Sequence, residues 1–438
     1  MQDFTTFFKG KKITVMGIDP EGRGVQDALF AATHGAQVVA TDMKSEESLG
    51  DSPELLRAAG ITLVLGEHKE EDFTNTDLVL RAASAPLGSP FLQAAKKANV
   101  RIETDETLFF ALAPRVTCIG VTGTRGKTTT THLIYDIVFR AYPNATYIAG
   151  NVRGIAALPL LEKIKEGDMV VMELSSWQLQ QFGENNMSPS IAVFTTFLPD
   201  HLNYYGGSMD AYLDDKAQIF LHQKSDDTLV LGAQALPSLE KYKSKIQSRV
   251  VIADVKKFPK AWKLHIPGEH NKANAICAIE AARALGIDEE VICQVVENFK
   301  GVPGRLELVR EVDGIKIYND TTATTPDATI AALEALDPEN KKNILLIMGG
   351  ADKGLDMTAL QPVVHAHAKE VFFLTGTGTD RVRGSDPVFN SLKEVVTAAM
   401  AAVTMGDIIL FSPAFASFGM FTNEYDRGDQ FNALVKNL

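Results

Sequence analysis

A run of glycine, threonine and lysine near residue 123 has the residue types and spacing of a phosphate-binding loop. The run is Gly120-Val-Thr-Gly-Thr-Arg-Gly-Lys-Thr-Thr129, and a hydrophobic stretch, 116–121, leads into it. Glycines allow backbone N–H groups to face phosphate oxygens, and the start of the following helix adds unpaired donors and partial positive charge. Lys127 can neutralise the outer phosphates, and the Thr128 hydroxyl can ligate Mg²⁺.

A chance glycine turn is the alternative, but strand, loop, Lys-Thr and helix all agree, so the sequence predicts ATP or GTP binding. The nucleotide-binding residues predicted in this loop are Gly123, Thr124, Arg125, Gly126, Lys127, Thr128 and Thr129.

Four more polar residues follow hydrophobic stretches farther along the chain. Asn151 lies in a glycine-flanked loop, Glu173 ends an apolar run, His201 follows another, and Lys216 lies in a helical stretch. A carboxylate at a strand end can hold the Mg²⁺ that bridges nucleotide phosphates. Local alternatives remain: a helix cap for Glu173, a hydrogen-bonded loop histidine for His201 and a surface charge for Lys216. Their order favours a site, because open α/β sheets bind ligands at the carboxyl ends of their strands.

A helix is predicted from about residue 269 to 285, and it opens with two asparagines. Asn271 and Asn274 are three residues apart, so they share one helical face and can read an adenine edge. The alternative is N-capping, which needs one asparagine alone.

The elements that must position these residues form three α/β regions. In the first, short apolar runs such as 12–16 and 37–41 alternate with helical segments, which predicts a parallel, helix-covered sheet. The loop after the first strand has Asp19 where a dinucleotide fingerprint has its middle glycine, which argues against an NAD site. Asp42 ends the second strand, where an acidic residue can bind a ribose hydroxyl or, alternatively, cap a helix.

The third region is predicted to form another parallel sheet, with strands at 315–318, 343–348, 370–375 and 407–412. Lys353 lies in a glycine loop and can bind an acidic substrate, or it is a flexible surface lysine. Ser417 and Phe418 follow the last strand and can offer a hydroxyl and backbone N–H groups to a carboxylate.

Composition bounds the function of the chain. It has 438 residues, enough for about three domains, and its net charge of −12 argues against a nucleic-acid surface. We find neither an apolar stretch of ~20 residues that could span a bilayer nor the regions of a signal peptide. Cys118, Cys277 and Cys293 have apolar neighbours and form no C-x-x-C pair, so we expect buried thiols in a reducing cytoplasm.

Together the motifs resemble those of the Mur ligase family over nearly the whole chain. They are Thr122-Gly-Thr-Arg-Gly-Lys-Thr-Thr129, Gly150-Asn-Val-Arg-Gly154, Glu173-Leu-Ser-Ser176, Asp200-His201, Lys216, Gly268-Glu-His-Asn271 and Gly301-Val-Pro-Gly-Arg-Leu-Glu307. The resemblance implies an α/β protein of three domains. These are a Rossmann-like UDP-sugar-binding domain (1–113), an ATP-binding domain with a parallel sheet (114–305) and a Rossmann-like amino-acid-binding domain (306–438).

The resemblance also implies an activity, ATP-dependent amide formation through an acyl phosphate in peptidoglycan synthesis. It is greatest to the members that add D-glutamate to UDP-N-acetylmuramoyl-L-alanine, and it implies a monomer. Lys127 would stabilise the transferring phosphoryl group. Thr128 and Glu173 would hold one Mg²⁺, and His201 and a carbamylated Lys216 a second. Carbamylation is required for this role because the ammonium of free lysine has no lone pair.

The remaining predicted site residues divide among three ligands. By the resemblance, Arg305 and Asp320 would contact ATP, together with Asn271 and Asn274. Asp42 and Asn151 would contact the sugar-peptide substrate. The incoming amino acid would be held by Thr324, Lys353, Ser417 and Phe418.

Several positions differ from the family pattern. Thr322 replaces a lysine, Glu424 an aromatic residue and Arg125 an asparagine, while Ala82-Ala83-Ser84 stands where a Ser-Pro-Gly loop is usual. These differences bear on the uridine site and on the choice of D-glutamate more than on the ATP site.

Three other interpretations stay open. A folylpolyglutamate-type ligase would lack the first region of about 110 residues. A sibling that adds a diamino acid would show an Asp-Asn-Pro-Arg loop, which we do not find. A nucleotide-binding module without ligase chemistry would not need Glu173, His201 and Lys216 together.

Overall fold

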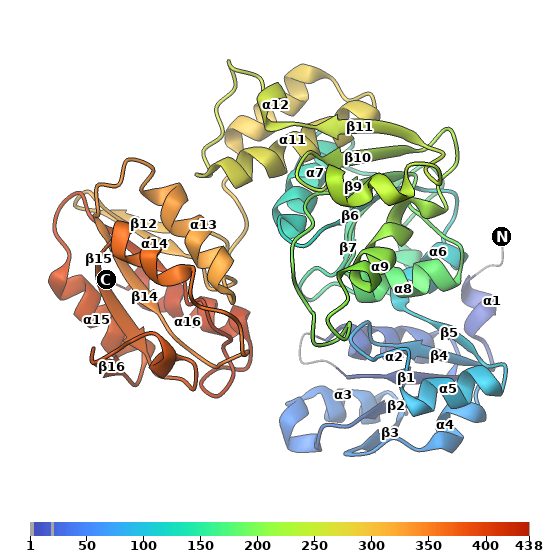
Figure 1. The fold of residues 1–438 in the computed structure, drawn as a ribbon. Coiled ribbons are helices and arrows are strands. Elements are labelled where there is room, and N and C mark those ends of the chain that lie inside the picture. Colours follow the sequence, from blue (N-terminus) through green and yellow to red (C-terminus); the bar gives the residue numbers. More distant parts are fainter. Residues whose placement is uncertain (1–3, 19–21, 438) are drawn as a thin grey trace. The chain divides into compact units, whose positions relative to one another are not determined.

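The structure is a computed structural model that describes residues 4–18 and 22–437. The chain forms two compact units, one of Met1–Lys257 with Asn274–Val295 and the other of Phe258–Ala273 with Val296–Leu438 (Figure 1). The first unit holds two sheets and the second holds one. The predicted α/β class is confirmed, and Asp19 lies outside the described residues.

The first sheet has the order β3-β2-β1-β4-β5, and all its neighbouring strands are parallel (Figure 1). Its elements are α1 (Phe4–Phe8), β1 (Lys12–Met16), α2 (Arg23–Thr33), β2 (Gln37–Asp42), α3 (Ser52–Ala58), β3 (Thr62–Leu65), α4 (Glu70–Thr74), β4 (Leu78–Arg81), α5 (Pro90–Lys97), β5 (Arg101–Glu103) and α6 (Asp105–Leu112). Parallel order brings the carboxyl ends of β1, β2 and β4 to one edge, because β1 lies between the other two.

The second sheet has the order β11-β10-β9-β6-β8-β7 and is also parallel. Its region contains β6 (Thr117–Thr122), α7 (Lys127–Ala141), β7 (Thr146–Gly150), β8 (Met169–Glu173), α8 (Ser176–Glu184), β9 (Ile191–Phe194), α9 (Met209–Leu221), β10 (Thr228–Gly232), α10 (Leu236–Leu239), β11 (Arg249–Ala253), α11 (Glu269–Ala284) and α12 (Glu289–Asn298). Every residue of β8 and β9 is buried, as expected of strands covered on both faces.

One apolar core runs from the first sheet into the second. Helix α6 contributes Leu108 and Phe109, both completely buried, and the same core continues through Val170 of β8. Cys118 and Cys277 are buried as predicted, whereas Cys293 is partly exposed. Among the described residues, we find no helix that has both the length and the apolar character to cross a membrane.

The sheet of the second unit has the order β12-β13-β17-β14-β15-β16. Its elements are β12 (Glu307–Val312), β13 (Ile315–Asn319), α13 (Pro326–Leu336), β14 (Ile344–Met348), α14 (Leu360–His367), β15 (Ala368–Leu374), β16 (Val388–Phe389), α15 (Leu392–Ala402), β17 (Ile408–Phe411) and α16 (Glu424–Lys436). Alternate residues of β14 enter two separate cores, so both faces of this sheet are covered.

The prediction of a wholly parallel third sheet is wrong at one edge. Strand β12 pairs antiparallel with β13 through a tight hairpin. Its turn is Asp313-Gly314, with φ of 50° and 74°. An Asp-Gly pair with both residues in the left-handed region is the favoured two-residue hairpin connection, and this signal was overlooked in the sequence.

Candidate active site

The loop predicted to bind phosphate, called the phosphate-binding loop below, joins β6 to α7. Gly123 and Gly126 have φ of 148° and 84°, which other residue types rarely adopt. A Cβ atom on Gly123 would lie 2.0 Å from the Thr195 hydroxyl, and one on Gly126 would lie 2.0 Å from Asn274 Oδ1. Both glycines are therefore required by close packing as well as by conformation.

The backbone N–H groups of this loop divide into those that bond to Thr196 and those that remain open to a ligand. Thr124 N donates to Thr196 O at 2.8 Å, and Arg125 N donates to Thr196 Oγ1 at 2.9 Å. The N–H groups of Gly126, Thr128 and Thr129 have no acceptor among the described residues. Donors for an anion therefore concentrate at the first turn of α7, where the helix also supplies partial positive charge.

Lys127 opens α7 and folds back over the loop. Its Nζ donates to the carbonyl oxygens of Gly123 at 3.1 Å and Thr124 at 3.2 Å. Thr128 next to it is half-buried. The cation is thus held over the same loop that exposes the N–H donors.

Glu173 ends β8 directly beside the loop, because β8 pairs with β6. Its side chain is 2% exposed, and Oε1 accepts from Asn151 Nδ2 at 3.0 Å. Oε2 is buried and has no hydrogen-bond partner within residues 4–18 and 22–437. The helix-cap alternative is wrong, because Ser175 caps α8 in a reciprocal pair with Gln178.

Lys216 is a buried residue, which rules out the surface-charge alternative. It is 1% exposed, its Nζ donates to Gly123 O at 2.8 Å, and it lies 4.8 Å from the centre of the Tyr212 ring. Burial, and then the neighbouring Lys127 cation, hold the pKa of Lys216 well below its usual range. Its amine is therefore biased toward the neutral, nucleophilic form.

His201 lies on the loop after β9, on the other side of β6 from Glu173. Its φ is 52°, and its side chain is 42% exposed. The ring lies 4.9 Å from that of Trp177 and 6.0 Å from that of Tyr212. Burial lowers the pKa of His201, although Asp200 acts in the opposite direction. The neutral imidazole that a metal needs is thereby favoured.

Asn271 and Asn274 both lie in the first turns of α11 and are 6% exposed. Asn271 Nδ2 donates to Pro267 O at 2.7 Å, so its side chain ties the helix start to the preceding segment. Asn274 packs against Gly126, and its carbonyl oxygen accepts from Thr130 Oγ1 at 3.4 Å. Of the two, Asn274 is placed beside the phosphate-binding loop.

Asp42 ends β2 at the carboxyl edge of the first sheet. Its Oδ2 accepts from Ile18 N at 2.7 Å and its Oδ1 from Lys44 N at 2.9 Å. The carboxylate thus ties the loop after β1 to the loop after β2. Each oxygen keeps a second lone pair for a ligand.

Asp320 follows β13 in the second unit and is 8% exposed. Its Oδ1 accepts from Leu306 N at 3.0 Å and its Oδ2 from Ser412 Oγ at 2.8 Å. Burial raises the pKa of Asp320 to about 7, although these hydrogen bonds and the neighbouring Arg305 favour the charged form.

Two of the predicted amino-acid-binding residues meet in the second unit. Lys353 Nζ donates to Thr324 Oγ1 at 2.9 Å, and both residues line a narrow crevice with Met357, Ala414 and Phe415. Lys353 itself is exposed, so its charge is accessible to a ligand.

Ser417 and Phe418 differ from each other in burial. Ser417 is 3% exposed and its Oγ has no hydrogen-bond partner among the residues that the structure describes, whereas Phe418 is 65% exposed. A buried hydroxyl without a partner is costly, and a bound carboxylate would satisfy it.

Two buried arginines were missed by the sequence analysis. Arg81 ends β4 and donates to Ala83 O, Ala85 O and Trp177 O at 2.9–3.2 Å, so it shapes the predicted uridine loop. Arg427 is completely buried and donates to Thr321 and to Phe415 O at 2.7–3.2 Å.

The two arginines differ in whether the sequence indicated their burial. Arg427 shares a four-residue spacing with Phe431 and Val435, the buried face of α16, so an arginine on an apolar stripe was a usable signal. Arg81 had none, since one charge at the end of a short strand is common.

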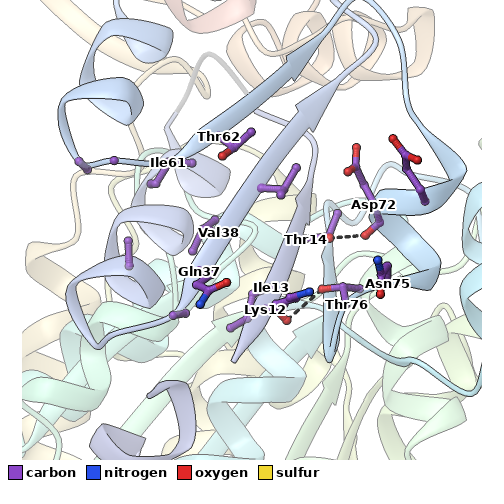
Figure 2. A pocket seen from close by; sticks show the side chains of 16 residues that line it. Lys12, Ile13, Thr14, Gln37, Val38, Ile61, Thr62, Asp72, Asn75 and Thr76 are labelled. Atoms are coloured by element: carbon purple, nitrogen blue, oxygen red, sulfur yellow. Dashed lines mark hydrogen bonds between the residues drawn. The ribbon is translucent and has the colours of Figure 1, made fainter. Parts of the chain in front are cut away.

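A separate pocket of about 600 Å³ lies in the first sheet, at the edge opposite Asp42 (Figure 2). It is lined by the first residues of β1, β2 and β3, among them Lys12 and Gln37, by the end of α2, by residues 59–61 after α3, and by α4 with the residues that follow it. The hydroxyl of Thr14 donates there to Asp72 O at 2.5 Å (Figure 2). The amino edge of the sheet thus carries this pocket, and the carboxyl edge carries the predicted substrate residues.

The Mur ligase middle domain, as a family model, matches residues 121–263, and the model described as Mur ligase, glutamate ligase domain matches residues 304–415. A UDP-N-acetylmuramoylalanine–D-glutamate ligase of Roseiflexus sp. (strain RS-1) is 38% identical to this chain, and the match covers 98% of the chain and 99% of that protein. The chain belongs to the Mur ligase family.

Solved structures agree in fold. UDP-N-acetylmuramate-alanine ligase MurC of Thermotoga maritima has a TM-score of 0.63 at 21% identity, with 98% of this chain and 99% of that chain covered. MurF ligase of the same organism, in complex with ADP, has a TM-score of 0.58 at 16% identity, with 99% and 97% covered. The similarity thus extends over both units, and this chain is an enzyme of the ATP-dependent, amide-forming ligase class.

Proposed function

We propose that this protein joins D-glutamate to UDP-N-acetylmuramoyl-L-alanine, at the expense of ATP, in the cytoplasmic synthesis of peptidoglycan precursors. One observation carries the proposal: a phosphate-binding loop, an unpartnered buried carboxylate and a buried lysine converge at adjoining strand ends. The name of the full-length Roseiflexus relative supports the substrates. We further propose the domains 1–113, 114–305 and 306–438, which hold one sheet each, and a monomeric state.

The nucleotide would bind at the first turn of α7. The N–H groups of Gly126, Thr128 and Thr129 have no acceptor in the part of the chain that the structure describes, and Lys127 lies over the same loop. Thr124 and Arg125 shape the loop through their own N–H bonds to Thr196. The ADP in the related MurF structure supports a nucleotide here.

The residues present fit a divalent cation. Glu173 Oε2 is buried without a partner, and an unpaired carboxylate oxygen in that setting is costly unless a cation or donor meets it. Thr128 and Glu173 would hold Mg²⁺ as hard oxygen donors. The described residues contain no cluster of three His, Cys, Asp or Glu side chains suited to a metal. Substrate phosphates and water are the usual further ligands of protein-bound Mg²⁺. When bound, Mg²⁺ would neutralise charge that develops on the phosphates.

Lys216 would serve as a ligand after carbamylation. A neutral amine attacks CO₂, the N–C bond forms, one amine proton leaves to solvent, and the carbamate carries the negative charge on oxygen. Burial of Lys216, which lowers its pKa, supplies the neutral amine. The carbamate and His201 would hold a second cation.

The reaction would proceed in two displacements. The substrate carboxylate attacks the γ-phosphorus and ADP leaves. The neutral amine of D-glutamate then attacks the acyl phosphate, phosphate leaves, and the amine gives up one proton to solvent. Lys127 and the N–H groups at the start of α7 would stabilise the phosphoryl oxygens, mostly by positioning and charge. Arg305 and Asp320 would also contact ATP, with Asn271 and Asn274 near the base.

The other two substrates would meet the residues predicted for them. Lys353, paired with Thr324, offers a cation to a carboxylate of D-glutamate, and the unpartnered Ser417 hydroxyl and the backbone near Phe418 offer donors. Asp42 and Asn151 would contact the sugar-peptide.

The acyl phosphate can be tested by isotope transfer. UDP-N-acetylmuramoyl-L-alanine labelled with oxygen-18 in its carboxylate should transfer one labelled oxygen to the inorganic phosphate that is released. Unlabelled phosphate together with amide product would contradict the acyl-phosphate route.

A further inference from the structure

The phosphate-binding loop is bound to the segment that carries His201. Most of these bonds use the backbone of the loop, such as Thr124 N to Thr196 O at 2.8 Å and Thr195 Oγ1 to Arg125 O at 2.6 Å. They would form with any residue at position 125. The side chain of Arg125 adds an ion pair, from its Nη1 to Asp200 Oδ2 at 2.7 Å.

Asp200 in turn holds the backbone of the next residue. Its other oxygen, Oδ1, accepts from His201 N at 2.9 Å. His201 has a φ of 52°, a left-handed conformation that residues with a Cβ adopt at an energetic cost. The bond from His201 N therefore helps to hold this turn, together with the bonds from Tyr204 N and Tyr205 N to His201 O at 2.9 and 3.2 Å.

The ring of His201 is placed by this turn and by aromatic neighbours. It contacts Trp177 at 4.9 Å and Tyr212 at 6.0 Å between ring centres. Asp200 Oδ2 lies 3.8 Å from His201 Nε2, too far for a hydrogen bond. A change in the turn should therefore move the ring.

We propose that Arg125 is a positioning residue, which acts through Asp200 to hold the His201 ring in its place beside Trp177 and Tyr212. Arg125 suits this role because its planar guanidinium also donates to Thr124 O at 3.3 Å, which limits its orientations. The effect on turnover rests on the proposed function, whereas the effect on the His201 ring does not.

The first test separates positioning from direct contact with nucleotide. Arg125→Gln should lower kcat about tenfold, because a displaced His201 ring would no longer hold the second cation in the productive geometry. It should leave KM for ATP within about twofold, because the N–H donors of α7 are unchanged. Arg125→Lys should recover part of kcat, and Arg140→Gln, at an exposed position of the same helix, should match the parent.

The second test needs no turnover. In a Trp262→Phe background, Trp177 is the remaining tryptophan, and its fluorescence reports the contact with His201. Arg125→Gln and Asp200→Asn should each shift the emission of Trp177, and the double variant should shift it no further, because both break one link.

The outcomes distinguish the two claims. If the parent protein has no ligase activity but the single variants shift the emission of Trp177, the positioning role is supported and the proposed function is refuted. Unchanged emission in both single variants, or a KM for ATP that rises tenfold while kcat holds, would overturn the positioning role.

Discussion

Each unit buries titratable side chains that the sequence singled out, and the units differ in how these side chains are satisfied. In the first unit, Lys216 has one carbonyl acceptor, and the nearby Glu173 has a buried oxygen with no partner. In the second, both oxygens of Asp320 accept hydrogen bonds. Burial moves Lys216 and Asp320 toward their neutral forms.

The difference separates a carboxylate with an oxygen left for a ligand from one whose two oxygens are both hydrogen-bonded within the protein. Unpaired buried groups are costly, so the first unit retains Glu173 Oε2 and the open N–H groups of α7 at the expense of its own stability. Asp320 instead ties Leu306 to Ser412 and so joins two loops. Chemistry is therefore expected to concentrate in the first unit and substrate choice in the second.

The largest expected loss of activity follows substitution of Lys127 in the first unit. Lys127→Ala should lower kcat/KM by at least about 10³-fold, because the cation over the phosphate-binding loop is lost. Lys243→Ala, a surface lysine paired with Glu240, is the matched control and should change little. Steady-state phosphate release measures both, and ATP-dependent activity retained by Lys127→Ala would remove the loop from the mechanism.

Substitution of Lys216 should cause the next largest loss of activity. Lys216→Ala should lower kcat about 10²-fold, and a short carboxylic acid such as formate should restore part of it, because the acid can take the place of the carbamate. Lys216→Met fills the same space and should not be rescued. Full activity of the alanine variant, without added acid, would show that Lys216 serves packing alone.

Lys353 should affect one substrate. Lys353→Ala should raise KM for the amino acid about tenfold, since a charge-assisted bond at an exposed site is lost. KM for ATP should stay constant, and Lys393→Ala on α15 is the exposed control. A rise confined to KM for ATP would move Lys353 to the nucleotide site.

Asp320 sharpens the comparison through stability. The pKa of Asp320 in the folded protein is about 7, above the ordinary value of 3.8 for an aspartate. Its contribution to the free energy of unfolding is therefore present in full below pH 3.8 and is lost as the pH rises to 7. The free energy of unfolding of the parent should fall across this window relative to Asp320→Asn, by up to about 4 kcal/mol. Denaturant titrations at pH 4, 5.5 and 7 measure this, and a constant difference would show that Asp320 is charged when folded.

Much of the first site was predictable from the sequence because strand order in a parallel sheet follows simple rules. Glu173 and the glycine loop end hydrophobic runs, and β8 pairs with β6. The burial of Lys216 was not predictable, because a lysine on a helix is usually solvated. The use of the Thr124 and Arg125 N–H groups within the loop also depends on Thr196, 71 residues beyond Arg125.

The second unit was harder to predict because its predicted residues lie on loops. Strand β12 was missed, although Asp313-Gly314 signalled its hairpin. The pairing of Lys353 with Thr324 joins loops 29 residues apart and leaves no periodic pattern in the sequence.

The central claim is tested most directly by phosphate release from ATP with UDP-N-acetylmuramoyl-L-alanine. Parallel reactions would contain D-glutamate, L-glutamate, D-aspartate or no amino acid. We expect release with D-glutamate alone. Release with a different amino acid would contradict the assignment of the second unit, and no release in any reaction would contradict the UDP-sugar substrate.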